Sequence, residues 1–496
     1  MLRDKPSECT FFKRFILFVF VVAGCFARTP PGLARTVQIS TVVFSPAVVK
    51  LSNPTQLEAS ARPQNIRLRI QAYDAFGNPV TPSKKNPITV NIYGAPTGTI
   101  SPTSASITSG DSIKLTYNGQ FFPNPITVEA YTANDGVGGQ AIGVTQLLQR
   151  HKVPTAYGSK NFVIPFDCSG EPDPACANDN IAGGLRVVGA IGYNNPTQQN
   201  LQDFTIDTGS LGAIVPLKDL GPDAIGPAGP GVKFYNSSGN TFAGSYYLAP
   251  ISLKQSDGTI VQTNPILVLA VDAGFCAPGY PNCTPPGTDI HYLGVGFNRN
   301  STTAGDAFDS PADNAFLEIT DDNNGTDVSP GYILSGDGAT VGITDTSSFT
   351  LASLTANRRV PGDWNTTPGC YQFPTLTGRN QFCGTLLLDV GIDGMFLDLV
   401  KNKRPAGAVD TIDPKTLPAN LQVSIIAGTP ANPALSYSFF YTPSASPTGV
   451  GPTKITWIVP AKYSPQIFVN TGRDVLFGYD YLFDGRFGNV GFKPVP

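Results

Sequence analysis

The chain has 496 residues, a net charge of −3 and only 14% charged residues. This length exceeds what one hydrophobic core supports and indicates about two to four domains. Because basic residues are not in excess, we expect no nucleic-acid partner. Short runs of Val, Ile, Thr and Phe alternate with clusters of Gly, Pro, Asn and Asp, which predicts an all-β protein.

The N-terminus has the pattern of an export signal. A short apolar run follows four basic residues, which are Arg3, Lys5, Lys13 and Arg14. The run from Phe15 to Ala23 is too short to span a bilayer comfortably. Cleavage after Ala27 would release a soluble protein, whereas Val22-Ala23-Gly24-Cys25 resembles a bacterial lipobox that would leave Cys25 lipidated. We predict a signal segment over residues 1–27 and a mature protein that is secreted or held in the cell envelope, with membrane attachment only through Cys25.

Residues 35–149 carry the pattern of a small β-sandwich. Strands are predicted at 37–44, 66–73, 88–93, 112–117 and 126–131, separated by turn signals. The stretch from Ala72 to Val80 contains Asp-Ala-Phe-Gly-Asn-Pro, which resembles a turn of bacterial immunoglobulin-like domains of the invasin type. The resemblance implies an immunoglobulin-like β-sandwich that serves as structural support, as an adhesive module or as a cover for the next domain.

After a polar linker that begins at Arg150, the chain over residues 155–496 repeats one pattern twice. An apolar run ends in Asp207-Thr208-Gly209-Ser210 in the first half and in Asp389-Val390-Gly391-Ile392 in the second. Such a run delivers a carboxylate from a buried strand and then turns sharply on glycine. We therefore predict an N-lobe over about 155–345 and a C-lobe over about 346–496, which bring Asp207 and Asp389 together around one water molecule.

The cysteines indicate disulfides rather than a metal site. Six of the eight lie beyond the signal segment in three local couples, which predicts the disulfides Cys168–Cys176, Cys276–Cys283 and Cys370–Cys383. No couple has Cys-x-x-Cys spacing, and the two histidines, His151 and His291, are far from forming a zinc set. We expect no metal.

Five motifs of the second unit, in order along the chain, together resemble the two-lobed pepsin-like aspartic peptidases. They are Ile206 to Pro216, Phe234 to Gly239, Tyr292 to Phe297, Tyr481 to Asp484 and Val490 to Phe492. The resemblance covers about residue 160 to the C-terminus and implies a bilobal pepsin-like β-barrel fold. It also implies catalytic Asp207 and Asp389, Tyr235 on a flap over the substrate, a polypeptide substrate in the cleft between the lobes, and no cofactor.

The proposed chemistry needs these residue types. Two carboxyl groups held close together cannot both ionise cheaply, so one keeps its proton while the other activates the water. Gly209 and Gly391 allow the tight turns that follow the aspartates. The resemblance gives the hydroxyls of Thr208 and Ser210 the role of fixing the first aspartate and tying the two turns together.

The second motif departs from the family pattern, because Val390 and Ile392 stand where the family has hydroxyl side chains. We expect a raised pKa for Asp389 and a looser pair of aspartates, since a missing hydrogen bond costs about 0.5–1.5 kcal/mol. The preferred function is an exported aspartic endopeptidase. Two alternatives stay open at this point: a weak or inactive pepsin-like protein that binds peptides or proteins, and a surface adhesin in which the sandwich carries the function.

Overall fold

The structure is a computed structural model, and it describes most of the chain beyond residue 38. The described residues are 39–45, 48–52, 64–74, 79–93, 100–117, 126–132, 143–150, 156–166, 174–235, 237–299, 306–308, 310–320, 328–357, 360, 362–375, 381–398, 419–442, 449–458 and 467–495. Strands dominate these residues, and a single α-helix occurs in them, so the all-β prediction is confirmed. No helix in this part of the chain is both long enough and apolar enough to cross a bilayer. The predicted signal segment with Cys25, and the turn at Gly77 and Asn78, lie outside the described residues.

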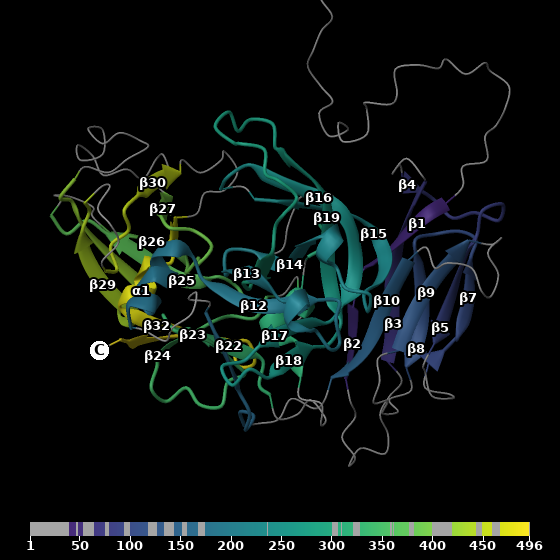
Figure 1. The fold of residues 1–496 in the computed structure, drawn as a ribbon, viewed down its shortest axis with the longest axis horizontal. Coiled ribbons are helices and arrows are strands. Elements are labelled where there is room, and N and C mark those ends of the chain that lie inside the picture. The colour runs from purple at the N-terminus through teal and green to yellow at the C-terminus, as the bar shows by residue number, and fades with distance from the viewer. Residues whose placement is uncertain are drawn as a thin grey trace, which may run out of the picture.

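Two five-stranded sheets form the N-terminal part of the molecule (Figure 1). Their strands are β1 (Ile39–Ser45), β2 (Val48–Ser52), β3 (Gln64–Asp74), β4 (Pro79–Val80), β5 (Ile88–Tyr93), β6 (Ile100–Ser101), β7 (Ser104–Ile107), β8 (Ser112–Tyr117), β9 (Ile126–Thr132) and β10 (Gly143–Arg150). One sheet has the order β1-β3-β8-β6 with β4 on β3, and the other has the order β2-β10-β9-β5-β7. Alternate side chains such as Leu68 and Leu115 from the first sheet and Val90 and Val128 from the second share one buried core. The two sheets therefore pack face to face, and their immunoglobulin-like character stays a prediction.

Three further sheets form the rest of the molecule. The strands before residue 345 are β11 (Phe162–Pro165), β12 (Arg186–Ile191), β13 (Gln202–Asp207), β14 (Leu211–Pro216), β15 (Ile225–Phe234), β16 (Asn240–Ala249), β17 (Ile251–Lys254), β18 (Ile260–Thr263), β19 (Ile266–Cys276), β20 (Tyr292–Val295), β21 (Ile319–Thr320), β22 (Gly331–Leu334) and β23 (Gly338–Val341). Those after it are β24 (Thr350–Ser353), β25 (Thr367–Gln372), β26 (Gln381–Leu387), β27 (Met395–Asp398), β28 (Gln422–Thr429), β29 (Asn432–Phe440), β30 (Ile455–Ile458), β31 (Phe468–Asn470), β32 (Tyr479–Asp484) and β33 (Asn489–Pro494). The helices are α1 (Pro174–Gly183) and the 3₁₀ turns η1 (Gln198–Asn200), η2 (Leu217–Asp219), η3 (Pro311–Asp313), η4 (Ala315–Leu317) and η6 (Asp474–Phe477).

A six-stranded sheet links the two halves of this region. Its order is β11-β23-β22-β32-β33-β24, so three of its strands come from before residue 345 and three from after it. A ten-stranded sheet belongs to the first half and a seven-stranded sheet to the second. One hydrophobic cluster runs through all three sheets, from Phe204 through Tyr332 and Phe483 to Leu386. Burial of this shared core fixes the two halves relative to each other.

The two halves repeat one strand arrangement around the segments that end in aspartate. In the first half, β20 lies parallel to β13 and antiparallel to β14, and β14 is parallel to β19. In the second half, β31 lies parallel to β26 and antiparallel to β27, and β27 is parallel to β30. The internal repeat that the two Asp-x-Gly segments indicate is therefore present in the strand topology.

The hairpin of β15 and β16 forms one edge of the ten-stranded sheet. Tyr235 lies directly after β15, at the start of the turn. Along its outer side, β15 lies beside β1 and β10 of the N-terminal sheets (Figure 1). The edge of the hairpin is thus covered by the preceding part of the chain, which also shields an otherwise unpaired strand edge.

Two of the three predicted disulfides are present. Cys276 is bonded to Cys283, and Cys370 to Cys383. Cys370 and Cys383 are directly paired residues of β25 and β26. The third couple, Cys168 and Cys176, lies outside the side chains that the structure describes, so this disulfide stays a prediction.

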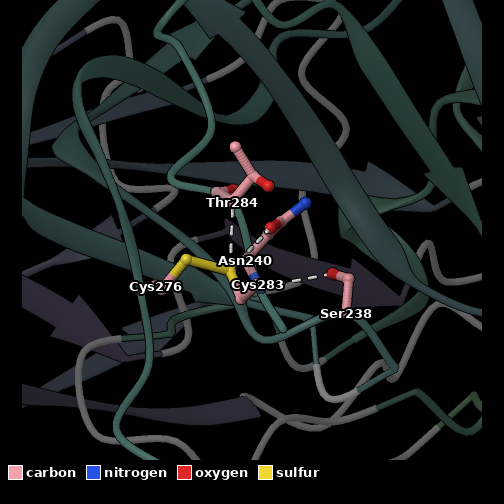
Figure 2. Close-up of a disulfide and its surroundings, with 5 residues drawn as sticks. All are labelled: Ser238, Asn240, Cys276, Cys283 and Thr284. Carbon is pink, nitrogen blue, oxygen red and sulfur yellow. Dashed lines mark hydrogen bonds between the residues drawn. A yellow bond between two sulfur atoms is a disulfide. The ribbon is translucent and has the colours of Figure 1, made fainter. Parts of the chain in front are cut away.

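The disulfide between Cys276 and Cys283 closes a loop against the tip of the β15–β16 hairpin. Figure 2 shows this bond beside Ser238 and Asn240 of the hairpin turn. The amide of Ala277 donates to the Gly239 carbonyl at 2.8 Å, and a side chain at Gly239 would overlap the ring of Tyr280. The Tyr280 ring also makes an edge contact with Phe234 at a centroid distance of 5.8 Å. The disulfide loop therefore supports the turn that carries Tyr235.

We predict that replacing Cys276 and Cys283 by serine loosens the hairpin tip. Removing a cross-link that closes so short a loop costs about 2–3 kcal/mol, so amides over residues 234–242 should exchange with solvent roughly 30- to 150-fold faster. Hydrogen exchange read by mass spectrometry checks this. The matched control is Cys370→Ser with Cys383→Ser, which should leave exchange at the hairpin tip unchanged. Equal exchange at the tip in the wild type and in the Cys276/Cys283 variant would contradict the prediction.

Candidate active site

Asp207 and Asp389 lie at the ends of equivalent strand segments and are both buried. Asp207 is the last residue of β13 and is 4% exposed, and Asp389 follows β26 and is 7% exposed. In each turn the amide two residues later donates back to the carboxylate, from Gly209 to Asp207 Oδ1 at 2.6 Å and from Gly391 to Asp389 Oδ1 at 3.0 Å. Each Asp-x-Gly turn thus holds its own carboxylate by a local hydrogen bond.

The two carboxyl groups meet each other across the two turns. A side chain on Gly209 would overlap the carboxylate of Asp389, and a side chain on Gly391 would overlap that of Asp207. The carboxyl groups of Asp207 and Asp389 therefore face each other across the two turns. Glycine is therefore needed at both positions because the opposite aspartate occupies the space of a side chain.

Thr208 supplies the side-chain hydrogen bonds that join the two turns in the part of the chain that the structure describes. Its Oγ1 donates to the carbonyl of Leu388 at 2.6 Å and accepts from the amide of Val390 at 3.0 Å. Val390 is fully buried and packs in the shared core. The link between the lobes therefore has one hydroxyl, as the departure of the second motif predicted.

Ser210 does not hold Asp207 as the sequence analysis expected. Its Oγ is buried without a hydrogen-bond partner among the described residues, and it points toward Gly294. The Tyr292 hydroxyl lies close to Asp207 instead, because a side chain on Gly391 would meet both of them. The expected role of Ser210 is corrected on this point, since no hydrogen bond joins it to Asp207 among the described residues.

Asn470 replaces the donor that Ile392 cannot provide. Its Nδ2 donates to Asp389 Oδ2 at 2.7 Å, and its Oδ1 accepts from the amide of Gly472 at 3.0 Å. Sequence reasoning missed Asn470, which lies at the end of β31, far from Asp389 along the chain. The signal that could have found it is the internal repeat, because Asn470 stands where Tyr292 stands in the first half.

Tyr235 packs against Tyr292 on the hairpin side of the two aspartates. Its ring makes edge contacts with Tyr292 and Phe242 at centroid distances of 5.4 and 6.0 Å. Its hydroxyl is buried and has no hydrogen-bond partner among the described residues. Burial, and then the charge of Asp207, raise the pKa of Tyr235 well above its ordinary value. The structure thus brings the predicted flap residue next to the first aspartate.

Burial dominates the electrostatics of the pair. Burial, then the charge of Asp207 and its hydrogen bond, hold the pKa of Asp389 well above its ordinary value of 3.8. The hydrogen bonds from Asn470 and Gly391 act in the opposite direction. The raised pKa has the direction that the sequence analysis expected, but its cause is burial beside a second carboxyl group. Asp389 is therefore the residue of the pair that keeps a proton in weak acid.

A buried ion pair holds the hairpin close to its turn. Lys233 of β15 has an exposed fraction of 5% and donates to Asp306, which has an exposed fraction of 1%, at 3.1 Å. The same Nζ donates to the carbonyl of Leu211 at 3.1 Å, and it lies 5.3 Å from the centroid of the Phe308 ring. Because Leu211 begins the strand after the first motif, Lys233 connects the hairpin to the turn that carries Asp207.

One group among the described residues has potential metal-ligand atoms close together. It consists of Asp219, Asp289 and His291. The ammonium group of Lys218 already pairs with Asp219 at 3.2 Å and with Asp289 at 3.1 Å. A lysine in this place neutralises the carboxylates that a metal would need. The group is a surface charge cluster away from the pair of aspartates.

Comparison with known proteins gives one distant likeness. No family profile matches the chain, and no curated protein matches it. Among solved structures, the aspartic proteinase from Irpex lacteus is similar, with 13% identity and a TM-score of 0.41. The likeness covers 68% of this chain and 98% of that one. At this level of similarity, the function has to be inferred from the arrangement of Asp207 and Asp389 themselves.

We predict that Lys233→Met lowers the free energy of unfolding by about 3–5 kcal/mol, because it leaves Asp306 buried and unpaired. The double variant Lys233→Met with Asp306→Asn should recover most of this loss. Urea unfolding at neutral pH checks both. Lys493→Met is the matched control, because its pair with Asp480 leaves the lysine 43% exposed, and it should cost less than about 1 kcal/mol. Equal losses in the Lys233 and Lys493 variants would show that the buried pair has no special weight.

Proposed function

We propose that the protein is an exported aspartic endopeptidase that cuts peptide bonds with Asp207 and Asp389. The observation that supports this most strongly is the facing pair of buried carboxyl groups, each delivered by the equivalent turn of one half. A pair of this kind shares one proton, so a base and an acid stand side by side. Few structural roles favour two buried acids in contact, because burial penalises their charge.

The roles of the two aspartates follow from their surroundings. Asp389 keeps the proton, since burial beside Asp207 raises its pKa. Asp207, ionised, takes a proton from a water molecule, and the resulting hydroxide attacks the carbonyl carbon of the peptide bond. Asp389 donates its proton to the carbonyl oxygen as the tetrahedral intermediate forms. Asp207 then passes its proton to the nitrogen, Asp389 takes a proton back from a hydroxyl of the intermediate, and the C–N bond breaks to give an amine and a carboxylic acid.

The β15–β16 hairpin supports a polypeptide substrate. Tyr235 lies near the first aspartate, and its hydroxyl gives an extended peptide a polar group on that side. The two disulfides in the described residues fit an oxidising compartment outside the cytosol. Export through residues 1–27, attachment through Cys25 and an immunoglobulin-like identity of the N-terminal sheets belong to the same proposal.

The rival proposal is a protein of this fold that binds peptides without cutting them. The apolar Val390 and Ile392 motivate it. Asn470 weighs against it, because the amide supplies the donor to Asp389 that the motif lacks. The endopeptidase is therefore preferred.

We predict that the mature protein cleaves a denatured protein substrate between pH 3 and 7, and that pepstatin inhibits the cleavage. Asp207→Asn and Asp389→Asn should each lower kcat by about 10²- to 10⁴-fold, because each removes one partner of the acid–base pair. Mass spectrometry of the products checks cleavage, and the denatured substrate alone is the control. Pepstatin binding without cleavage by the folded wild type would support the inert binding protein. Neither binding nor cleavage would support the adhesin.

We also predict a specific dependence of stability on pH. Because the pKa of Asp389 is raised on folding, its contribution to stability is present below its unfolded pKa and is lost as the pH rises through the folded value. Asp389→Asn stays neutral throughout. The variant should therefore gain more than about 1 kcal/mol of stability over the wild type on going from pH 3.5 to pH 7, since one pKa unit corresponds to about 1.4 kcal/mol. Urea unfolding at the two pH values checks this, and a difference that does not change with pH would contradict it.

A further inference from the structure

Tyr292 and Asn470 occupy equivalent positions in the two halves. Tyr292 of β20 pairs with Thr205, two residues before Asp207. Asn470 of β31 pairs with Leu387, two residues before Asp389. Each also pairs on its other side with the strand that follows the Asp-x-Gly turn, Tyr292 with Ile214 and Asn470 with Phe396. Both side chains therefore start from the same point relative to the aspartate of their own half.

Each of these residues brings a neutral donor group to one carboxyl group. Asn470 Nδ2 donates to Asp389 Oδ2 at 2.7 Å, and the Tyr292 hydroxyl lies close to Asp207, since a side chain on Gly391 would meet both of them. The amide of Asn470 has a defined orientation, because its Oδ1 accepts from the amide of Gly472. The Tyr292 ring is held by its edge contact with Tyr235.

We propose that Tyr292 and Asn470 are a matched pair of positioning residues, which fix the outer side of Asp207 and Asp389 in place of the hydroxyls of the Asp-x-Gly motifs. The inference rests on the proposed function and adds the means by which the pair stays aligned with an incomplete second motif. The motif residues do not perform this task. Ser210 Oγ makes no hydrogen bond to an aspartate among the described residues, and Val390 and Ile392 have no hydroxyl group.

The charged and titratable groups near the two aspartates decide how a change in pH dependence is interpreted. Asp207 and Asp389 both stabilise the charged form of the half-buried Arg299, which also interacts with Asp363. Among the described residues, Asp207 also interacts electrostatically with Tyr235, Tyr292 and Tyr332, and burial raises the pKa of all three phenols, so they stay protonated. Arg299 and Tyr235 are unchanged when Asn470 or Tyr292 is replaced, so a change in pH dependence reports the lost donor.

The two replacements have opposite expected effects on the pH profile of kcat/KM. Asn470→Leu removes a donor that favours the ionised form of Asp389, so the alkaline limb should move to higher pH. Tyr292→Phe removes a donor to the carboxylate of Asp207, so the acid limb should move to higher pH and the active range should narrow. Both should lower kcat by about 10- to 100-fold with a smaller change in KM, because alignment is lost while the substrate contacts remain.

Two variants serve as matched controls. Thr471→Val changes the residue after Asn470, whose buried hydroxyl donates to the Gly472 carbonyl. Tyr332→Phe removes another buried phenol, whose hydroxyl donates to the Val295 carbonyl at 2.8 Å. Both lower stability without touching an aspartate, so they should leave both limbs of the profile in place.

A second readout does not depend on hydrolysis. The loss of urea midpoint in Asn470→Leu relative to the wild type should grow as the pH rises from 3.5 to 7, because the amide stabilises the charged form of Asp389. In Thr471→Val the loss should stay constant. Asn470→Ala is used if leucine prevents folding.

A wild type without hydrolysis would overturn the proposed function and leave this readout intact. A pH-independent loss in Asn470→Leu, or unmoved limbs in both variants of an active enzyme, would overturn the positioning role.

Discussion

The close approach of the buried carboxyl groups of Asp207 and Asp389 is the constraint on which the rest of the structure depends. Two acids with exposed fractions of 4% and 7% can stay together only if one of them remains neutral. The surrounding chain supplies donors to both carboxyl groups, from the amide of Gly209 to Asp207 and from the amide of Gly391 and the side chain of Asn470 to Asp389. The turn glycines, the inner strands and the shared core are arranged around this single contact.

Duplication of the strand arrangement explains how two distant segments meet with such accuracy. Each half presents its aspartate where an outer strand ends beside an inner strand, and the six-stranded sheet fixes one half against the other. The two halves are nevertheless unequal in chemistry. The first provides a phenol and the bridging Thr208, and the second provides an amide and an apolar valine. This inequality is consistent with different tasks for the two aspartates, since a base and an acid need different surroundings.

The sequence predicted the parts of the site that depend on local pattern. The two aspartates and their glycines are recognisable because a buried strand followed by Asp-x-Gly has few other uses. The predicted strands 88–93 and 112–117 have the same bounds in the structure. Asn470 could not be found in this way, because its role depends on the register of β31 against β26. The bond expected from Ser210 failed for the same reason, since nothing local shows that Tyr292 already reaches Asp207. The parallel pairing of β2 with β10 also escaped prediction, because it joins segments far apart along the chain.

The β15–β16 hairpin is restrained on three sides, and this restraint bears on how a substrate would enter. The strand before its turn is held by the buried pair of Lys233 and Asp306, its tip by the disulfide loop from Cys276, and its outer edge lies beside β1 and β10. Opening the hairpin as a rigid body would break a buried ion pair, which costs several kcal/mol. A hairpin held in this way keeps Tyr235 aligned over the aspartates before substrate arrives, and such preorganisation lowers the entropy lost on binding.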